Sequence, residues 1–85
     1  MPRVVIYSTR VCPSCAAAKE LLCRKGIAFE EIDLTDQPEE RARLRERTGR
    51  ATVPQIFIGD RPVGGYDDLR ALDNKGELDP LLAGS

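Results

Sequence analysis

The chain has 85 residues, the size of one small domain, and we expect a single domain over residues 1–85. Its 13 basic and 14 acidic residues leave a formal net charge of −1, so no overall electrostatic field favours nucleic acid or an anionic membrane. The hydrophobic fraction of 41% is typical of a soluble globular protein, and no apolar stretch is long enough to span a membrane.

The cysteine content indicates the compartment. Three cysteines, an odd number, argue against a secreted scaffold held together by paired cysteines. The first residues lead directly into a short strand pattern and do not resemble a signal peptide. We therefore expect a reducing compartment, the cytoplasm.

The first quarter of the chain predicts a strand followed by a helix. Residues 3–7 are mostly β-branched or aromatic and contain no breaker, which indicates a buried strand. Residues 13–25 predict a helix with Pro13 at its first position and Gly26 just after its end. The side chains at helical spacing that would pack on a sheet are Cys15, Ala17, Ala18, Leu21 and Leu22.

A second strand and a second helix follow. Residues 27–34 predict a strand that lies parallel to the first, because the intervening helix makes a right-handed crossover. A polar side chain within residues 35–37 is expected to cap the next helix, which has Pro38 in its first turn and ends at Gly49.

The last third predicts a hairpin and a final helical region. Residues 55–58 and 61–63 form antiparallel strands around the turn at residues 59–60, and Pro62 suggests a sheet edge. A helix then opens at residues 66–69 and stops near residues 74–76. One or two further helical turns over residues 77–82 are expected to pack against the core.

Cys12 and Cys15 lie at the expected start of the first helix. The unpaired N–H groups and the dipole of a helix start stabilise a thiolate there, so Cys12 is the expected nucleophile and Cys15, further in, the shielded partner. A zinc site is disfavoured, since zinc takes four ligands and the chain has three cysteines and no histidine. A structural disulfide would close a very short loop and add little stability. The spacing therefore predicts a redox-active dithiol.

The order βαβαββα, with the cysteine pair after the first strand, resembles the glutaredoxins, and most of all the small bacterial dithiol kind. The resemblance rests on Cys12-Pro13-Ser14-Cys15, on Thr52-Val53-Pro54 before Gln55-Ile56-Phe57-Ile58, and on Gly64-Gly65-Tyr66-Asp67-Asp68-Leu69. It implies a thioredoxin-like α/β fold with a four-stranded mixed sheet flanked by helices. It also implies one glutaredoxin domain over residues 1–85.

The same resemblance implies a glutathione site. Pro54 would follow a cis peptide bond, so that the backbone of Val53 pairs with the cysteinyl unit of glutathione and Thr52 lies beside it. The γ-glutamyl end would be held at Gly65, Tyr66 and Asp67, where helix-start N–H groups accept the α-carboxylate and the Asp67 carboxylate takes the ammonium. Tyr66 has both a ligand-contact and a packing interpretation.

Two positions depart from the family pattern. Many glutaredoxins carry lysine where this chain has Thr9, and the glycyl carboxylate of glutathione still needs a cation. Arg10 and Arg41 are the candidates for that role. Ser14 stands where tyrosine is common, which predicts a more open pocket and leaves the affinity open.

The implied activity is glutathione-dependent reduction of protein–glutathione mixed disulfides and of protein disulfides, with Cys12 as nucleophile and Cys15 as resolving thiol. Glutathione is then a co-substrate, and no metal or prosthetic group is expected. The expected partners are glutathione and glutathionylated or disulfide-containing proteins, with no nucleic acid or membrane, and the chain is expected to be a monomer.

Three other functions stay open. Cys12 of two chains and two glutathiones could hold a [2Fe-2S] cluster across a dimer. A redoxin of the same shape could instead take electrons from a thioredoxin-type reductase, and a non-enzymatic interaction module has only the size of the chain in its favour. Cys23 is expected at the core boundary of the first helix; if exposed, it would be open to glutathionylation.

Overall fold

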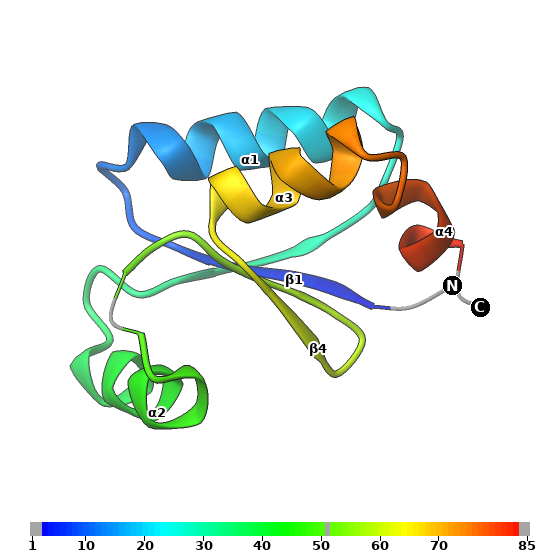
Figure 1. The fold of residues 1–85 in the computed structure, drawn as a ribbon. Coiled ribbons are helices and arrows are strands. Elements are labelled where there is room, and N and C mark those ends of the chain that lie inside the picture. Colours follow the sequence, from blue (N-terminus) through cyan, green and yellow to red (C-terminus); the bar gives the residue numbers. More distant parts are fainter. Residues whose placement is uncertain (1–2, 51, 84–85) are drawn as a thin grey trace.

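Strands and helices alternate along the part of the chain that the structure describes. The computed structural model describes residues 3–50 and 52–83. In chain order the elements are β1 (Val4–Ser8), α1 (Pro13–Arg24), β2 (Glu30–Asp33), α2 (Pro38–Thr48), β3 (Gln55–Ile58), β4 (Arg61–Gly64), α3 (Tyr66–Asn74) and α4 (Leu78–Leu82) (Figure 1). Within these residues, every helix is too short or too polar to cross a membrane.

The strands form one sheet in the order β2-β1-β3-β4. β1 runs parallel to β2 and antiparallel to β3, and β3 runs antiparallel to β4. The predicted four-stranded mixed sheet is therefore confirmed. Because β1 and β2 are parallel, the chain crosses from one to the other through α1.

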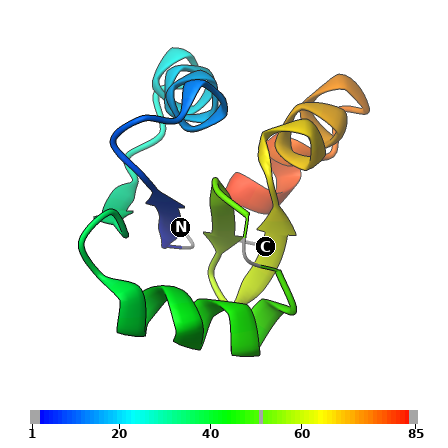
Figure 2. The ribbon, with the colours of Figure 1, turned by 90° about the vertical axis from the view of Figure 1, so that its left-hand side faces the viewer.

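Helices cover both faces of the sheet. α1 and α3 lie over one face and α2 lies against the other (Figures 1 and 2). Val4 and Ile6 of β1 belong to the core under α1 and α3, whereas Val5 and Tyr7 pack against the core under α2. The fully buried centres of the two cores include Ile6, Leu22, Ile56, Leu69 and Leu78 on one side and Leu34 on the other. β1 is therefore held on both faces and at both edges.

The end of α1 explains why β2 is shorter than predicted. Gly26 has a φ of +69°, and its N–H donates to the Cys23 carbonyl at 3.0 Å. The N–H of Ile27 donates to the Leu22 carbonyl at 3.0 Å, which completes a Schellman motif. Residues 27–29 thus finish the helix and lead into the strand, and β2 begins at Glu30. The predicted strand over residues 27–34 was too long.

Cys23 is exposed, so its predicted place at the core boundary was wrong. Leu21 and Leu22 are the buried side chains of that turn, and Cys23 follows them onto the outer face of α1. The predicted inward positions of the helix are confirmed for Cys15, Ala18, Leu21 and Leu22, and Ala17 is half-buried.

The start of α2 lacks the predicted side-chain cap. Its N-cap residue is Gln37, which makes no capping hydrogen bond through its side chain, although Pro38 begins the helix as expected. The Thr35 hydroxyl instead accepts a hydrogen bond from the N–H of Arg10 at 3.0 Å, and the Asp36 carboxylate pairs with the Arg10 guanidinium at 2.7 Å. A contact with the loop before α1 has taken the groups that would have capped the helix.

A small polar cluster joins β1, β2 and α1. The hydroxyl of Ser8, a buried residue, donates to the Glu31 carboxylate at 2.6 Å, and the Lys19 ammonium donates to the same oxygen at 2.8 Å. The hydrogen bond from Lys19, followed by that from Ser8, lowers the pKa of Glu31 below its ordinary value. The cluster thereby stabilises the ionised form of Glu31 in the folded chain.

The turn from β4 into α3 depends on Gly64. Its φ is +113°, and a Cβ added there would lie 2.3 Å from Oδ2 of Asp68. That same Asp68 oxygen accepts the N–H of Gly65 at 3.0 Å and so caps the start of α3. At Gly65, by contrast, an added Cβ would meet the Pro54 carbonyl oxygen at 3.6 Å, an ordinary contact.

Substitution of the two adjacent glycines by alanine should therefore change the free energy of unfolding by different amounts. Gly64→Ala should lower the free energy of unfolding by about 2 kcal/mol, because it strains the backbone and displaces the Asp68 cap. Gly65→Ala, the matched control, should change it by no more than about 0.5 kcal/mol in either direction. Urea unfolding followed by circular dichroism measures both, and equal losses in the two variants would contradict this account of the turn.

The Glu31 cluster predicts a pH dependence of stability. Because the folded pKa of Glu31 is lowered, its contribution is present above the unfolded pKa and is lost as the pH falls through the folded value. Between about pH 6 and about pH 3, the wild type should lose more unfolding free energy than Glu31→Gln does. Glu20→Gln, which removes an exposed carboxylate from α1, should behave like the wild type.

Candidate active site

The end of β1 delivers Cys12 to the start of α1. Cys12 is the N-cap residue, with extended backbone angles, and Pro13 is the first residue of the helix. The N–H of Cys15 donates to Sγ of Cys12 at 3.2 Å. A backbone donor and the positive end of the helix dipole therefore both act on this sulfur, and they stabilise a thiolate there when the protein is reduced.

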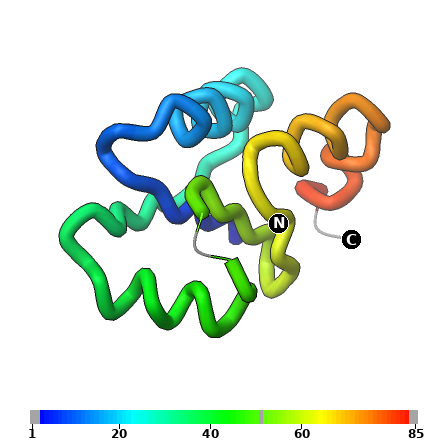
Figure 3. The backbone as a smooth tube through the Cα atoms, turned by 60° about the vertical axis from the view of Figure 1, so that its left-hand side comes forward, coloured from blue at the N-terminus to red at the C-terminus, as the bar shows by residue number. Residues whose placement is uncertain are grey.

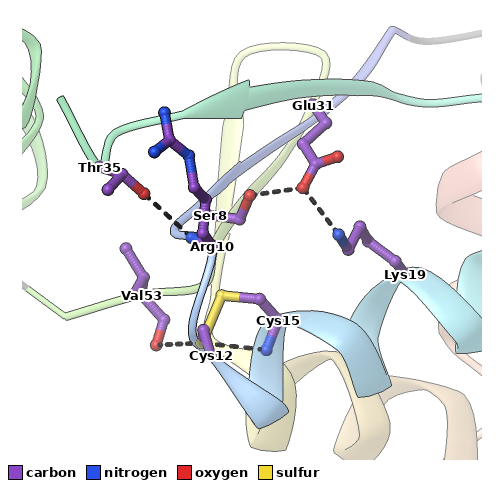
Figure 4. The surroundings of a disulfide bond; sticks show 8 residues. All are labelled: Ser8, Arg10, Cys12, Cys15, Lys19, Glu31, Thr35 and Val53. Carbon is purple, nitrogen blue, oxygen red and sulfur yellow. Dashed lines mark hydrogen bonds and ion pairs between the residues drawn. A yellow bond between two sulfur atoms is a disulfide. The ribbon is translucent and has the colours of Figure 1, made fainter. Parts of the chain in front are cut away.

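Cys12 and Cys15 form a disulfide, and their Cα atoms lie 5.2 Å apart (Figure 4). Cys12 is half-buried, whereas Cys15 is 1% exposed and belongs to the inner face of α1. An incoming thiolate therefore reaches the sulfur of Cys12 first. Cys15 is thus shielded as predicted, and the role of Cys12 as nucleophile stays a prediction.

Val53 and Pro54 bring a third segment to the cysteines. The peptide bond between them is cis, as predicted. The Val53 carbonyl oxygen lies 3.9 Å from Sγ of Cys12, and Pro54 is buried (Figure 4). The loop before α1, the segment before β3 and the start of α3 all lie at the same end of the sheet (Figures 1 and 3). The backbone of Val53 is thus available to a ligand that reaches Cys12.

A groove of about 230 Å³ runs from this segment to the start of α3. Its lining residues are Ser14, Arg50, Thr52, Val53, Pro54, Gly65, Tyr66, Asp67 and Asp68. Six of the residues proposed from the sequence for glutathione binding therefore lie together: Thr52, Val53, Pro54, Gly65, Tyr66 and Asp67. Tyr66 lines the groove and also packs against the core under α1 and α3. Its packing interpretation is therefore confirmed, and its contact with a ligand stays a prediction.

Arg10 does not line this groove. Its guanidinium pairs with the carboxylates of Asp33 at 3.3 Å and Asp36 at 2.7 Å. Hydrogen bonds from Thr35, and then the charge of Arg10, hold the pKa of Asp33 below its ordinary value. These contacts fasten the loop before α1 to the end of β2. Binding of the glycyl carboxylate by Arg10 stays a prediction.

Arg41 lies on α2, in a separate surface hollow shared with Pro38, Arg45 and Glu46. It is not among the residues that line the groove beside Cys12. The structure therefore brings neither of the two predicted cations to that groove, and the role of Arg41 also stays a prediction.

Two features of the site were not found from the sequence. Arg50 lines the groove and pairs with Asp68, and Val11, next to Cys12, is 92% exposed. Arg50 and Asp68 are 18 residues apart, and nothing in the local pattern pairs them.

Within residues 3–50 and 52–83, no three histidine, cysteine or acidic side chains gather as a metal site would require.

Comparison with known proteins identifies the family. Residues 4–63 match the sequence profile of the Glutaredoxin family. A glutaredoxin of Pseudomonas aeruginosa is 55% identical over 83 residues, a match covering 98% of this chain and 99% of the relative.

Two solved structures share the fold. A buckwheat glutaredoxin–glutathione complex has a TM-score of 0.88 at 32% identity, with coverage of 96% of this chain and 77% of the other. A structure titled for the metal binding of glutaredoxins has a TM-score of 0.75 at 57% identity, with coverage of 96% and 89%. Since the family profile and the 55% identical relative both span most of the sequence, the chain belongs to the glutaredoxin family, whose members are thiol–disulfide oxidoreductases.

Proposed function

We propose that the chain reduces protein–glutathione mixed disulfides and protein disulfides with glutathione as co-substrate. The observation that carries this proposal is the groove that starts at Val53 and Ser14, beside Cys12, and ends at the start of α3. The backbone of Val53 offers strand-like hydrogen bonds to the cysteinyl unit, and Asp67 offers a carboxylate to the ammonium. The buckwheat relative, solved as a glutathione complex, supports the same ligand.

The reaction with a mixed disulfide needs one cysteine. The Cys12 thiolate attacks the glutathione sulfur, the bond to the protein substrate breaks, and the substrate leaves as a thiolate. A second glutathione thiolate then attacks the glutathione sulfur bound to Cys12, which releases glutathione disulfide and restores the Cys12 thiolate. Cys15 takes no part in this route.

A protein disulfide requires both cysteines. Cys12 attacks one sulfur of the substrate, and the Cys15 thiolate then attacks Sγ of Cys12 to release the reduced substrate. The product on the enzyme is the Cys12–Cys15 disulfide, which the structure contains. Two glutathiones reduce it, the first by attacking the half-buried Cys12.

The substrates in this proposal are proteins of the cytoplasm, and the chain acts on them as a monomer. A monomer is the default for a single domain of this size, and the net charge of −1 favours no charged polymer as partner. Sedimentation of the reduced protein at micromolar concentration tests the monomer.

A second candidate is the dimeric [2Fe-2S] carrier ligated by Cys12 and glutathione. The 57% identical relative, whose structure is titled for metal binding, is the observation in its favour. Expression with iron and glutathione distinguishes the two functions. A brown dimer without reductase activity would support the carrier, and a colourless active monomer would support the oxidoreductase.

Cysteine variants test the two reaction routes. With a glutathionylated peptide, Cys12→Ser should lose activity by at least about a hundredfold, because the nucleophile is removed. Cys15→Ser should keep activity with that peptide and lose it with a protein disulfide. A coupled assay that follows glutathione disulfide measures all of these rates.

Cys23→Ser is the matched control, because Cys23 is an exposed thiol on the same helix. It should keep both activities at wild-type rates. Loss of mixed-disulfide activity in Cys15→Ser, with Cys12→Ser still active, would reverse the assigned roles.

The γ-glutamyl end predicts a separate effect. Asp67→Asn removes the proposed partner of the ammonium, so KM for the glutathionylated peptide should rise roughly fivefold while kcat stays within about twofold. Asp60→Asn, in the exposed turn between β3 and β4, is the control and should leave KM unchanged. A similar rise in KM in both variants would indicate an effect of net charge alone.

A further inference from the structure

A second hollow, of about 270 Å³, lies between the end of α2 and the hairpin of β3 and β4. Its charged lining residues are Arg47 and Arg50, so we call it the arginine hollow. Arg50 also lines the groove beside Cys12, which means that the two sites adjoin. The apolar part of the lining comes from four strand residues: Ile56, Phe57, Pro62 and Val63.

The described residues that line the arginine hollow carry charge of one sign. Arg47 and Arg50 are cationic, and no acidic residue lies among them. The groove beside Cys12, by contrast, is lined by the carboxylates of Asp67 and Asp68 as well as by Arg50. Two guanidinium groups that line one space repel each other, and an anion bound between them removes the repulsion. The arginine hollow therefore favours a negatively charged ligand.

Arg47 is held in place without an anionic partner. It is an exposed residue near the end of α2, and its guanidinium carbon lies over the Phe57 ring, 4.4 Å from the ring centroid. Phe57 is 4% exposed and meets the Tyr7 ring edge-on, so this contact rests on a buried support. In the part of the chain that the structure describes, no carboxylate pairs with Arg47. Since a contact with a ring face leaves N–H donors unused, the guanidinium can still bind an anion.

Arg50 supplies the second cation from a fixed backbone position. Its N–H donates to the Thr48 hydroxyl at 3.2 Å, and its carbonyl accepts a hydrogen bond from the side-chain amide of Gln55, a buried residue, at 2.8 Å. Its ion pair with Asp68 is long, at 3.4 Å, and joins side chains that are 58% and 50% exposed. Such a pair is weak, and a guanidinium has five N–H donors. Donors of both arginines are thus available in the hollow.

The position of the hollow indicates what would occupy it. When a protein disulfide reacts at Cys12, the segment around the attacked cysteine must lie along the adjoining groove. Because the groove and the hollow meet at Arg50, residues that flank this cysteine can extend into the hollow. A glutamate there would place its carboxylate on the two arginines and its methylene groups on the apolar lining.

We infer that the arginine hollow binds acidic side chains next to the reactive cysteine of a protein substrate, through Arg47 and Arg50. The inference rests on the proposed reduction of protein disulfides, and it adds a preference among the possible substrates. Arg47 does not line the groove beside Cys12, so its contribution can be tested without altering that groove.

Matched peptides test the preference. Each peptide contains one disulfide, and its cysteines are flanked either by glutamates or by glutamines. The wild type should reduce the glutamate peptide with a KM roughly three- to tenfold lower than that of the glutamine peptide, with kcat within about twofold. Added salt should shrink the difference, because it screens exposed charges.

Arginine variants test the assignment to the hollow. Arg47→Met keeps a long side chain for the Phe57 ring and removes the charge, so it should lose most of the preference. Arg47→Lys should retain it. The control Arg70→Ala removes an exposed arginine from α3, on the opposite face of the sheet, and should match the wild type (Figure 2). Equal loss of the preference in Arg47→Met and Arg70→Ala would overturn the inference, because net charge alone would then explain it.

A small substrate provides the second control. The mixed disulfide of glutathione and 2-mercaptoethanol has no residues that could reach the hollow, so Arg47→Met should reduce it at the wild-type rate. If this rate falls as much as the rate with the glutamate peptide, Arg47 supports the fold or the groove, and the inference is wrong.

NMR spectroscopy of the oxidised protein locates the contact. The glutamate peptide with serine in place of both cysteines should shift the amide signals of Phe57, Val63 and Gly64, and the shifts should be absent in Arg47→Met. Equal shifts with inorganic phosphate at the same concentration would make the hollow a site for free anions and would overturn the inference.

The proposed function has a separate outcome. A wild type that turns over the glutathione mixed disulfide but shows no preference for the glutamate peptide overturns the inference alone. A wild type that is inactive with glutathione on every substrate overturns the proposed function, and the inference with it.

Discussion

The burial of β1 on both faces is the constraint on which the site depends. Its side chains alternate between the core under α1 and α3 and the core under α2, and its two edges pair with β2 and β3. The strand therefore has little freedom to shift, and the residues after it start from a fixed point. Arg10 then fastens the following loop to Thr35 and Asp36, so that Cys12 meets the helix start in one geometry.

Shared carboxylates organise the charged part of the site. Asp68 accepts the Gly65 N–H and pairs with Arg50, so one side chain both ends the β4 turn and positions a cation. Asp33 and Asp36 likewise pair with Arg10, in the loop that leads to Cys12. Each of these ion pairs is exposed and contributes little stability alone. Their effect is to restrict the positions of the two arginine side chains.

Local patterns in the sequence were sufficient for most of the architecture. Helical spacing identified the buried face of α1, and strand composition with turn residues identified β1, β3 and β4. The start of β2 was placed too early because the strand-like side chains of Ile27 and Phe29 conceal a helix-ending motif. Cys23 was predicted at the core boundary, but Leu21 and Leu22 fill the buried face of this turn of α1 and Cys23 is exposed.

The failures within the site have a different cause, since they involve contacts distant in sequence. A polar side chain within residues 35–37 was expected to cap α2, and the hydroxyl of one of them, Thr35, instead accepts a hydrogen bond from the backbone N–H of Arg10, 25 positions earlier. Arg50 pairs with Asp68, which lies 18 residues later in α3, and no local sequence pattern predicts a contact between residues so far apart. The cis bond before Pro54 came from the resemblance to a family, because a single X-Pro pair favours the trans isomer.

The burial of Cys15 leaves one accessible sulfur atom for the proposed catalytic cycle. With 1% of its surface exposed, this sulfur is shielded from bulky thiols, alkylating reagents and peroxides, whereas Cys12 and Cys23 are accessible to them. In the proposed cycle, glutathione and the oxidised substrate therefore approach the same sulfur atom, that of Cys12, in turn. Oxidative damage at Cys12 would stop both proposed routes at once, while Cys15 would remain an intact thiol without a mixed disulfide to resolve.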